Sequence, residues 1–157
     1  MLFRSAWLDR LGSQSDLLNT TSLVQWNFDK QYLVELREQG KNVVPTAMVT
    51  SASEAAISQA LRQIPAGEIV VKPRFGADAY GVTRLPSKPE AIAAHFERFG
   101  ANGGLLIQPF IPGVELERER SLVFIGGRFS HALYRNPFGS GRRGRLLTTY
   151  TLRRRRS

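Results

Sequence analysis

Short strand-like runs alternate with helix-like segments between residues 46 and 111, and this order limits the possible folds most strongly. The segments "NVVPTAMVT", "EIVVKP", "GVTRLP" and "GLLIQPFI" have the length and composition of strands. Pro45 predicts that the first of them lies at a sheet edge or leads into a bend. The segments "SEAAISQALRQI" and "SKPEAIAAHFERFG" have helical spacing, with Ser51 or Ser53 capping the first and Ser87 or Lys88 the second. The order predicts an α+β fold with helices on one face of a small sheet.

The flanking segments predict further elements on both sides of this region. Residues 5–18 can form a short helix. The stretch "NTTSLVQWNFDKQYLVELREQG" predicts a stronger helix that is capped by Asn19 or Ser22, contains Lys30 and ends at Gly40. After residue 111, "PGVELERER" reads as a connector, and "SLVFIGGRFSHALYR" predicts a β-hairpin that turns at two consecutive glycines.

Composition excludes several classes of protein. The 157 residues suffice for one domain or for parts of two subdomains. Without cysteine the chain can form neither a disulfide framework nor a thiolate metal site, and His95 and His131 lie far apart in sequence. No apolar run approaches the roughly 20 residues needed to cross a bilayer, and the N-terminus lacks the apolar region of a signal peptide. We therefore expect a cytoplasmic protein.

The net charge of +9 comes mostly from the end of the chain. Residues 139–157 contain seven arginines and no acidic residue, which leaves 9 − 7 = +2 for residues 1–138. Such a segment is expected to be a solvated, disordered tail. The alternative is a small basic nucleic-acid-binding protein that uses these arginines to contact phosphates.

The segment "GEIVVKPRFGADAYGV" is the first candidate for chemistry. Lys72 ends an apolar strand, and a loop with Gly76 and Gly81 follows it at once. The lysine can be a surface residue whose stem covers apolar neighbours, or a fixed ammonium that neutralises a phosphate. Glycines favour the second reading, because successive backbone N–H groups of such a loop can bind an anion. Neither a Walker loop nor a dinucleotide fingerprint is present.

The segment "LLIQPFIPGVELE" is the second candidate. A flat base could lie along the backbone of residues 108–111, and one of the following carboxylates, Glu115, Glu117 or Glu119, could take ribose hydroxyls. The alternative is an ordinary strand exit followed by solvated acids.

Taken together and in order, four segments resemble an ATP-grasp enzyme of the type shared by glutathione synthetases and ribosomal-protein-modifying amino acid ligases. They are "WNFDK" leading to "VVPT", "IVVKP" with its glycine-bearing loop, "LIQPFI", and "RERSLVFIGGRFSHALYR". The match covers roughly residues 19–137. The resemblance implies an ATP-grasp small lobe, an antiparallel sheet with helices on one face, in residues 19–112. It implies the start of a second lobe in residues 113–138, and it makes residues 1–18 the end of an N-terminal domain that is otherwise missing.

The resemblance also implies roles for particular residues. Lys30 and Lys72 would reach the nucleotide phosphates, and residues 76–81, with Gly76, Ala77 and Gly81, would form a flexible lid. The adenine would lie against Gln108, Pro109, Phe110 and Ile111, chiefly through their backbone. Glu119, or Glu117, would hold the ribose, and Arg135 would lie near the transferred phosphoryl group or the substrate.

In such enzymes ATP phosphorylates a carboxylate, and an amine then attacks the acyl phosphate. The resemblance therefore implies ATP, Mg²⁺ and small carboxylate and amine substrates, with no membrane partner. The family's Mg²⁺ ligands come late in the chain, but no Asp or Glu follows Glu119 here, and Asn136 is the one asparagine left. The pattern changes abruptly near residues 137 and 138. We therefore expect a truncated ATP-binding member without the Mg²⁺ site, inactive as a ligase in this form.

Overall fold

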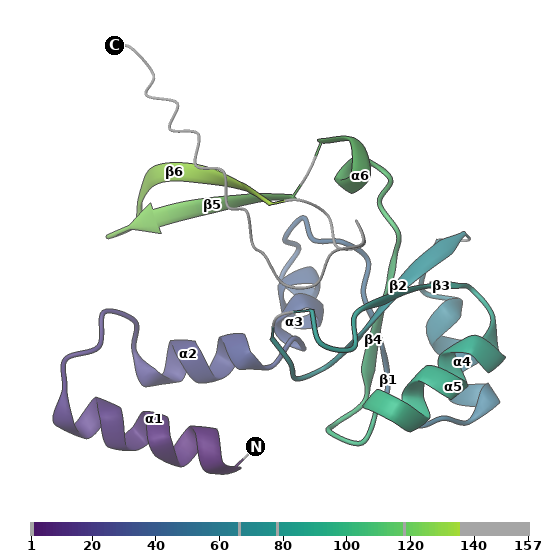
Figure 1. Ribbon diagram of the computed structural model, residues 1–157, viewed down its shortest axis with the longest axis horizontal. Helices are drawn as coiled ribbons and strands as arrows, with labels where there is room; N and C mark the ends of the chain where they lie inside the picture. Colours follow the sequence, from purple (N-terminus) through teal and green to yellow (C-terminus); the bar gives the residue numbers. More distant parts are fainter. Residues whose placement is uncertain (1, 66, 78, 118, 136–157) are drawn as a thin grey trace. The chain divides into compact units, whose positions relative to one another are not determined.

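The computed structural model describes residues 2–65, 67–77, 79–117 and 119–135, and the predicted tail at 139–157 lies outside them. The chain divides into two compact units, Met1–Phe110 and Ile111–Ser157, whereas the sequence led us to expect a boundary after residue 112. Figure 1 shows the elements of both units along the chain.

The first unit is built on a four-stranded antiparallel sheet with the order β1-β4-β2-β3. Its strands are β1 (Ala47–Val49), β2 (Glu68–Pro73), β3 (Thr83–Pro86) and β4 (Leu105–Pro109). The two central strands, β2 and β4, pair over five positions, from Ile69↔Pro109 to Pro73↔Leu105. Strand β1 lies at an edge and begins just after Pro45, as the proline predicts.

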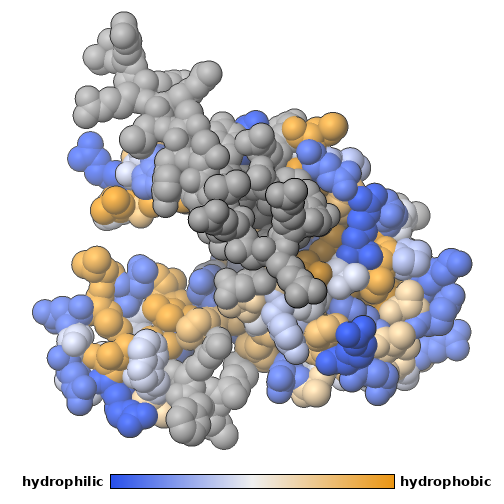
Figure 2. Space-filling model, in the orientation of Figure 1, coloured by the Kyte–Doolittle hydropathy of each residue, from blue (hydrophilic) through white to orange (hydrophobic). Residues whose placement is uncertain are grey.

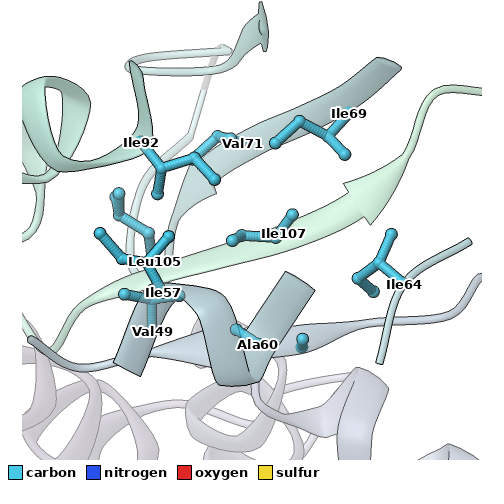
Figure 3. Packing of buried hydrophobic residues seen from close by; sticks show 10 residues of the cluster. Val49, Ile57, Ala60, Ile64, Ile69, Val71, Ile92, Leu105 and Ile107 are labelled. Carbon is cyan, nitrogen blue, oxygen red and sulfur yellow. The ribbon is translucent and has the colours of Figure 1, made fainter. Parts of the chain in front are cut away.

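Two helices, α4 (Glu54–Leu61) and α5 (Pro89–Phe99), cover one face of this sheet. Ser53 caps α4 by accepting a hydrogen bond from the backbone N–H of Ala56, and Pro89 opens the first turn of α5. Strands and helices together bury one apolar cluster (Figure 3), with members Ala47, Val49, Ile57, Ala60, Ile64, Ile69, Val71, Ile92, Leu105 and Ile107. The predicted α+β architecture, with helices on one face of a small antiparallel sheet, is confirmed.

The region before the sheet forms three helices, α1 (Leu2–Gln14), α2 (Thr21–Phe28) and α3 (Tyr32–Glu38). The prediction of one continuous helix up to Gly40 was therefore wrong, and Lys30 lies in a turn. Thr20, rather than Asn19 or Ser22, caps α2. The helix stops because Asp29 has an extended backbone and its carboxylate is held by Arg74, 45 residues away. A contact of that sequence separation leaves no trace in local helical spacing.

Helices α1 and α2 contribute little to the core. Among the side chains of α1 that the structure describes, from residue 6 onward, only Leu8 belongs to the buried apolar set, and the described part of α2 has no buried residue. Trp7, Leu23, Trp26 and Phe28 are between 40% and 55% exposed. Figure 2 shows the resulting hydrophobic surface over these two helices. The stability of the first unit therefore depends on the sheet and on α4 and α5.

The second unit contains a short helix and a hairpin. Helix α6 (Gly113–Glu117) forms where the sequence was read as a connector. Strands β5 (Glu119–Ile125) and β6 (Arg128–Arg135) pair in antiparallel register around Gly126 and Gly127, which confirms the predicted hairpin. Both glycines have positive φ, +55° and +74°, as a two-residue turn matching the strand twist requires. Within the described ranges, no helix has the length and the apolar character that crossing a membrane demands.

Substitution of Gly104 tests how closely the chain before β4 approaches the end of β1. At φ +97° a Cβ on Gly104 would lie 2.2 Å from the carbonyl oxygen of Val49, a contact that only a backbone shift can relieve. We expect Gly104→Ala to lower the free energy of unfolding by about 3 kcal/mol or more. Gly40→Ala is the matched control, because Gly40 has φ +73° with open space around it, and it should cost only about 1 kcal/mol. Equal losses in urea denaturation would contradict this account.

Candidate functional site

The face of the sheet opposite the core carries two of the predicted site residues of the central strands, Lys72 and Gln108, whereas Pro109 pairs with Ile69 on the core face. Side chains alternate along a strand, so Val70 and Lys72 of β2 lie opposite to Ile69 and Val71, which are in the core. Lys72 pairs with Leu106 of β4, and Val70 pairs with Gln108. The register therefore puts Lys72 and Gln108 on one face, on neighbouring strands and two positions apart. We call this surface the ligand face; it also includes Arg84, which pairs with Val70 from β3.

Gln108 is 8% exposed, and its side chain has a structural partner. Its amide Nε2 donates to Thr46 Oγ1 at 2.8 Å, and that hydroxyl donates to the carbonyl of Val44 at 2.8 Å. These bonds hold the chain entering β1 against β4. The carboxamide of Gln108 is thus engaged within the fold.

Lys30 lies where β2 leaves the sheet. Its backbone N–H donates to the carbonyl oxygen of Arg74 at 3.2 Å. Its Nζ donates to the carbonyl of Gly76 at 2.7 Å and approaches that of Arg74 at 3.5 Å. The Lys30 ammonium, predicted from the resemblance to reach phosphates, therefore lies at the start of the glycine-bearing loop.

An ion pair between Asp29 and Arg74 fixes this arrangement. Arg74 Nε donates to Asp29 Oδ1 at 2.7 Å, and Nη2 donates to Oδ2 at 2.5 Å. Both side chains are about three-quarters buried, with 24% and 25% of their surface exposed. Such bidentate pairs are among the stronger and more directional polar contacts in proteins. Sequence reasoning missed both residues, although Asp29 precedes Lys30 and Arg74 follows Pro73 in the quoted segments.

The charges in this cluster influence one another. Burial tends to raise the pKa of Asp29, but the hydrogen bonds from Arg74 and Gln31 and the charges of Arg74 and Lys30 outweigh it and lower that pKa. Burial lowers the pKa of Lys30, and the charge of Asp29 opposes the change. The hydrogen bond to Asp29 raises the pKa of Arg74. The cluster is therefore a paired acid and base with one additional, partly desolvated ammonium.

The far end of the glycine-bearing loop is attached to α5. His95 Nε2 lies 2.8 Å from the carbonyl oxygen of Gly81, and the rings of Tyr80 and Phe99 meet edge to face at 5.4 Å. A Cβ on Gly81 would lie 2.7 Å from Pro73 Cγ, so the loop returns close to its origin. His95 and Phe99 were not predicted, although their i, i+4 spacing on α5 is a signal that they share a face.

At the other end of β2, Glu68 and Arg84 meet at Phe110. Its backbone N–H donates to the carbonyl of Glu68 at 2.8 Å, and the guanidinium of Arg84 lies 3.7 Å from its ring centroid. Arg84 also forms an ion pair with the Glu68 carboxylate, which lowers the pKa of Glu68. The predicted adenine segment thus contains an aromatic ring that lies against a cation. Sequence reasoning missed the contribution of Arg84.

The remaining predicted residues belong to the second unit. Ile111 is its first residue. Glu119 and Arg135 are register partners across the hairpin, so their backbones lie opposite each other. The side chains of Glu117, Glu119 and Arg135 are outside the described part of the structure, and their predicted roles stay predictions.

A cavity of about 460 Å³ lies elsewhere, where α4 and α5 begin. It is lined by Ala52, Glu54, Ile57, Pro89, Glu90 and Ala93. These residues belong to the helical side of the sheet, so the cavity is separate from the ligand face. Among the described residues, no three His, Cys, Asp or Glu side chains gather as a metal ion requires.

Comparison with known proteins gives two levels of similarity. The chain is 35% identical over 135 residues to the cycloserine biosynthesis protein DcsG of Streptomyces lavendulae, covering 83% of this chain and 45% of that protein. The crystal structure of D-cycloserine synthetase DcsG matches with a TM-score of 0.74 and 33% identity, over 86% of this chain and 47% of that one. No protein-family model matches the chain.

The second level is similarity of fold alone. The crystal structure of D-alanine-D-alanine ligase from Helicobacter pylori matches with a TM-score of 0.56 and 17% identity, over 88% of this chain and 43% of that one. The chain thus spans about half the length of the relatives it matches.

The Asp29–Arg74 pair predicts a pH-dependent difference in stability. Because the pKa of Asp29 is lower in the folded chain than its ordinary value of 3.8, its contribution is complete above that value and is lost as the pH falls through the folded-state pKa. We expect Asp29→Asn to lower the free energy of unfolding by about 1–2 kcal/mol near neutral pH. The difference in free energy of unfolding between the wild type and this variant should then become smaller below about pH 4. If urea denaturation gives the same stability difference at every pH, the Asp29–Arg74 ion pair does not stabilise the fold in the way described.

Proposed function

Because the chain belongs to the ATP-grasp superfamily, we propose that its first unit, Met1–Phe110, binds ATP along the ligand face. The observation that carries the proposal is the arrangement of two lysines around one loop. Lys30 is bonded to the loop at Gly76, and Lys72 lies on the ligand face two residues before Arg74. Two ammonium groups near a loop with small residues suit a polyphosphate, whose charge needs cations and whose oxygens need donors.

The adenine is proposed to lie at the other end of the ligand face, against Gln108 and Phe110 and the backbone of Pro109, whose side chain belongs to the core face because Pro109 pairs with Ile69. The engaged side chain of Gln108 supports recognition by backbone rather than by the carboxamide. Phe110 and Arg84 supply a flat aromatic and guanidinium pair there, and both groups stack well on planar partners. The roles that the resemblance implies for Ile111, Glu119 and Arg135 of the second unit stay predictions.

The residues present do not fit a magnesium site. Mg²⁺ is normally held by one or two carboxylates together with substrate phosphates. The described residues contain no suitable cluster, and the sequence has no Asp or Glu after Glu119. We therefore assign no residue of this chain to the metal.

We propose that the activity served by this lobe is ATP-dependent joining of a small carboxylate to an amine. The similar proteins are named a D-cycloserine synthetase and a D-alanine-D-alanine ligase, which supports amino-acid-like substrates. The lobe itself would bind and orient the nucleotide, and positioning of this kind is a large part of catalysis in phosphoryl transfer.

A nucleic-acid-binding role through the seven arginines of residues 139–157 is the alternative class. It is not favoured, because the similarity to ligases covers most of the chain, whereas the excess charge is confined to this segment. The two functions differ in their response to salt, since a nucleic-acid complex of this kind weakens steeply as salt rises.

Replacing Lys72 tests the proposed function directly. We expect ATP with Mg²⁺ to raise the melting temperature of the wild type, because a ligand of the folded state stabilises it by mass action. Lys72→Met should weaken ATP binding by roughly 10-fold or more, since it removes a charge-assisted contact to phosphate. Calorimetric titration of both proteins measures the change.

Lys41→Met is the control, because Lys41 is an exposed lysine of the same unit and lies outside the ligand face. It should bind ATP as the wild type does. A cooperative melt that ATP leaves unchanged in the wild type would overturn the proposal. Tight binding of an oligonucleotide that is lost without residues 139–157 would favour the alternative.

A further inference from the structure

We propose that Asp29 and Arg74 are positioning residues, which hold Lys30 where it meets the nucleotide phosphates. This inference rests on the proposed function, because it names two residues that prepare the same site. It goes beyond that function, since neither residue is expected to touch the nucleotide itself.

The first step is the connection from the sheet to Arg74. The backbone N–H of Arg74 donates to the carbonyl of Gly104 at 3.1 Å, which continues the pairing of β2 with β4 one residue past the strand. Arg74 is thereby fixed relative to Lys72 and to the rest of the ligand face. Its guanidinium lies 5.2 Å from the ring centroid of Phe75, within the range of a cation–π contact.

The second step is the connection from Arg74 to Lys30. The Arg74 guanidinium donates two hydrogen bonds to the carboxylate of Asp29. The backbone carbonyl of Arg74 accepts a hydrogen bond from the backbone N–H of Lys30. Since Asp29 and Lys30 are consecutive, three bonds from one residue determine where the Lys30 main chain lies. The turn between α2 and α3 therefore follows the geometry of the sheet.

The third step concerns the ammonium group. Lys30 Nζ donates to the carbonyl of Gly76 at 2.7 Å, so a contact within the fold extends the side chain toward the loop. Lysine has a long side chain with much rotamer freedom to lose on binding. When the side chain loses this rotamer freedom on folding, the entropy cost is not incurred again on binding and does not weaken the affinity for phosphate. Asp29 also adds a compensating charge to the partly buried ammonium, which burial alone disfavours.

A purely structural ion pair would behave differently. It would stabilise the fold, and its removal would affect all ligands alike. A positioning pair acts through Lys30, so its removal should weaken the phosphate-dependent part of binding and should have no further effect once Lys30 is absent. This distinction can be measured with a double-mutant cycle.

The experiment measures dissociation constants of the full chain for ATP and adenosine in wild type, Asp29→Asn, Lys30→Met and the double variant. We expect Asp29→Asn to weaken ATP roughly 10-fold, while adenosine changes by less than about 2-fold. In the Lys30→Met background, Asp29→Asn should weaken ATP by no more than about 2-fold. Arg74→Lys keeps the positive charge but cannot form both hydrogen bonds to the Asp29 carboxylate. It should therefore show an intermediate loss of ATP affinity.

Ile57→Val serves as the control for stability, because Ile57 is fully buried on α4, on the helical side of the sheet. It should lower the melting temperature to a similar extent and leave both affinities unchanged. Equal losses for ATP and adenosine, or additive losses in the double variant, would overturn the inference while the proposed function survives. Absence of ATP binding in the folded wild type would refute the proposed function, and this inference with it.

Discussion

The register between β2 and β4 is the constraint on which the other features depend. Side chains alternate between the faces of a strand, so a slip of one residue would exchange the two faces. In the observed register Ile69 and Val71 join the core, while Lys72 lies across from Leu106 on the opposite face. Because Ile69, Val71, Leu105 and Ile107 are completely buried, a register shifted by one residue would be costly in free energy. The same apolar residues that stabilise the fold therefore determine which face carries a charge suited to phosphate.

The secondary structure of the sheet and of its covering helices could be predicted from sequence, because the signals are local. Ser53 and Pro89 mark helix starts, and Gly126 with Gly127 marks the hairpin turn. The break between α2 and α3 could not be predicted in this way. The residues on both sides have helical spacing, and the contact that interrupts the helix comes from Arg74, far along the chain. Helix α6 was missed because a five-residue helix has almost no periodicity to detect.

The candidate site shows the same division between local and distant information. Alternation along β2 indicates that Lys72 leaves the core face, and the segment around Gln108 can be recognised by its composition. The position of Lys30 depends on a salt bridge that joins two separate segments. His95 and Arg84 each act by reaching another element, Gly81 in one case and Phe110 in the other. A single sequence gives the residue types at these positions but not the pairs that they form.

The glycine-bearing loop is attached at both of its ends, and this bears on how such a lobe would receive a ligand. At its start, Lys30 bonds to Gly76 beside the Asp29–Arg74 pair, and at its end His95 bonds to Gly81. Both attachments lead back to elements that bury core residues, β2 in the first case and α5 in the second. A polyphosphate would therefore encounter a site whose boundaries are already ordered. Because an attachment made during folding adds no entropic cost to binding, the affinity of the lobe should depend on these contacts as much as on the lysines themselves.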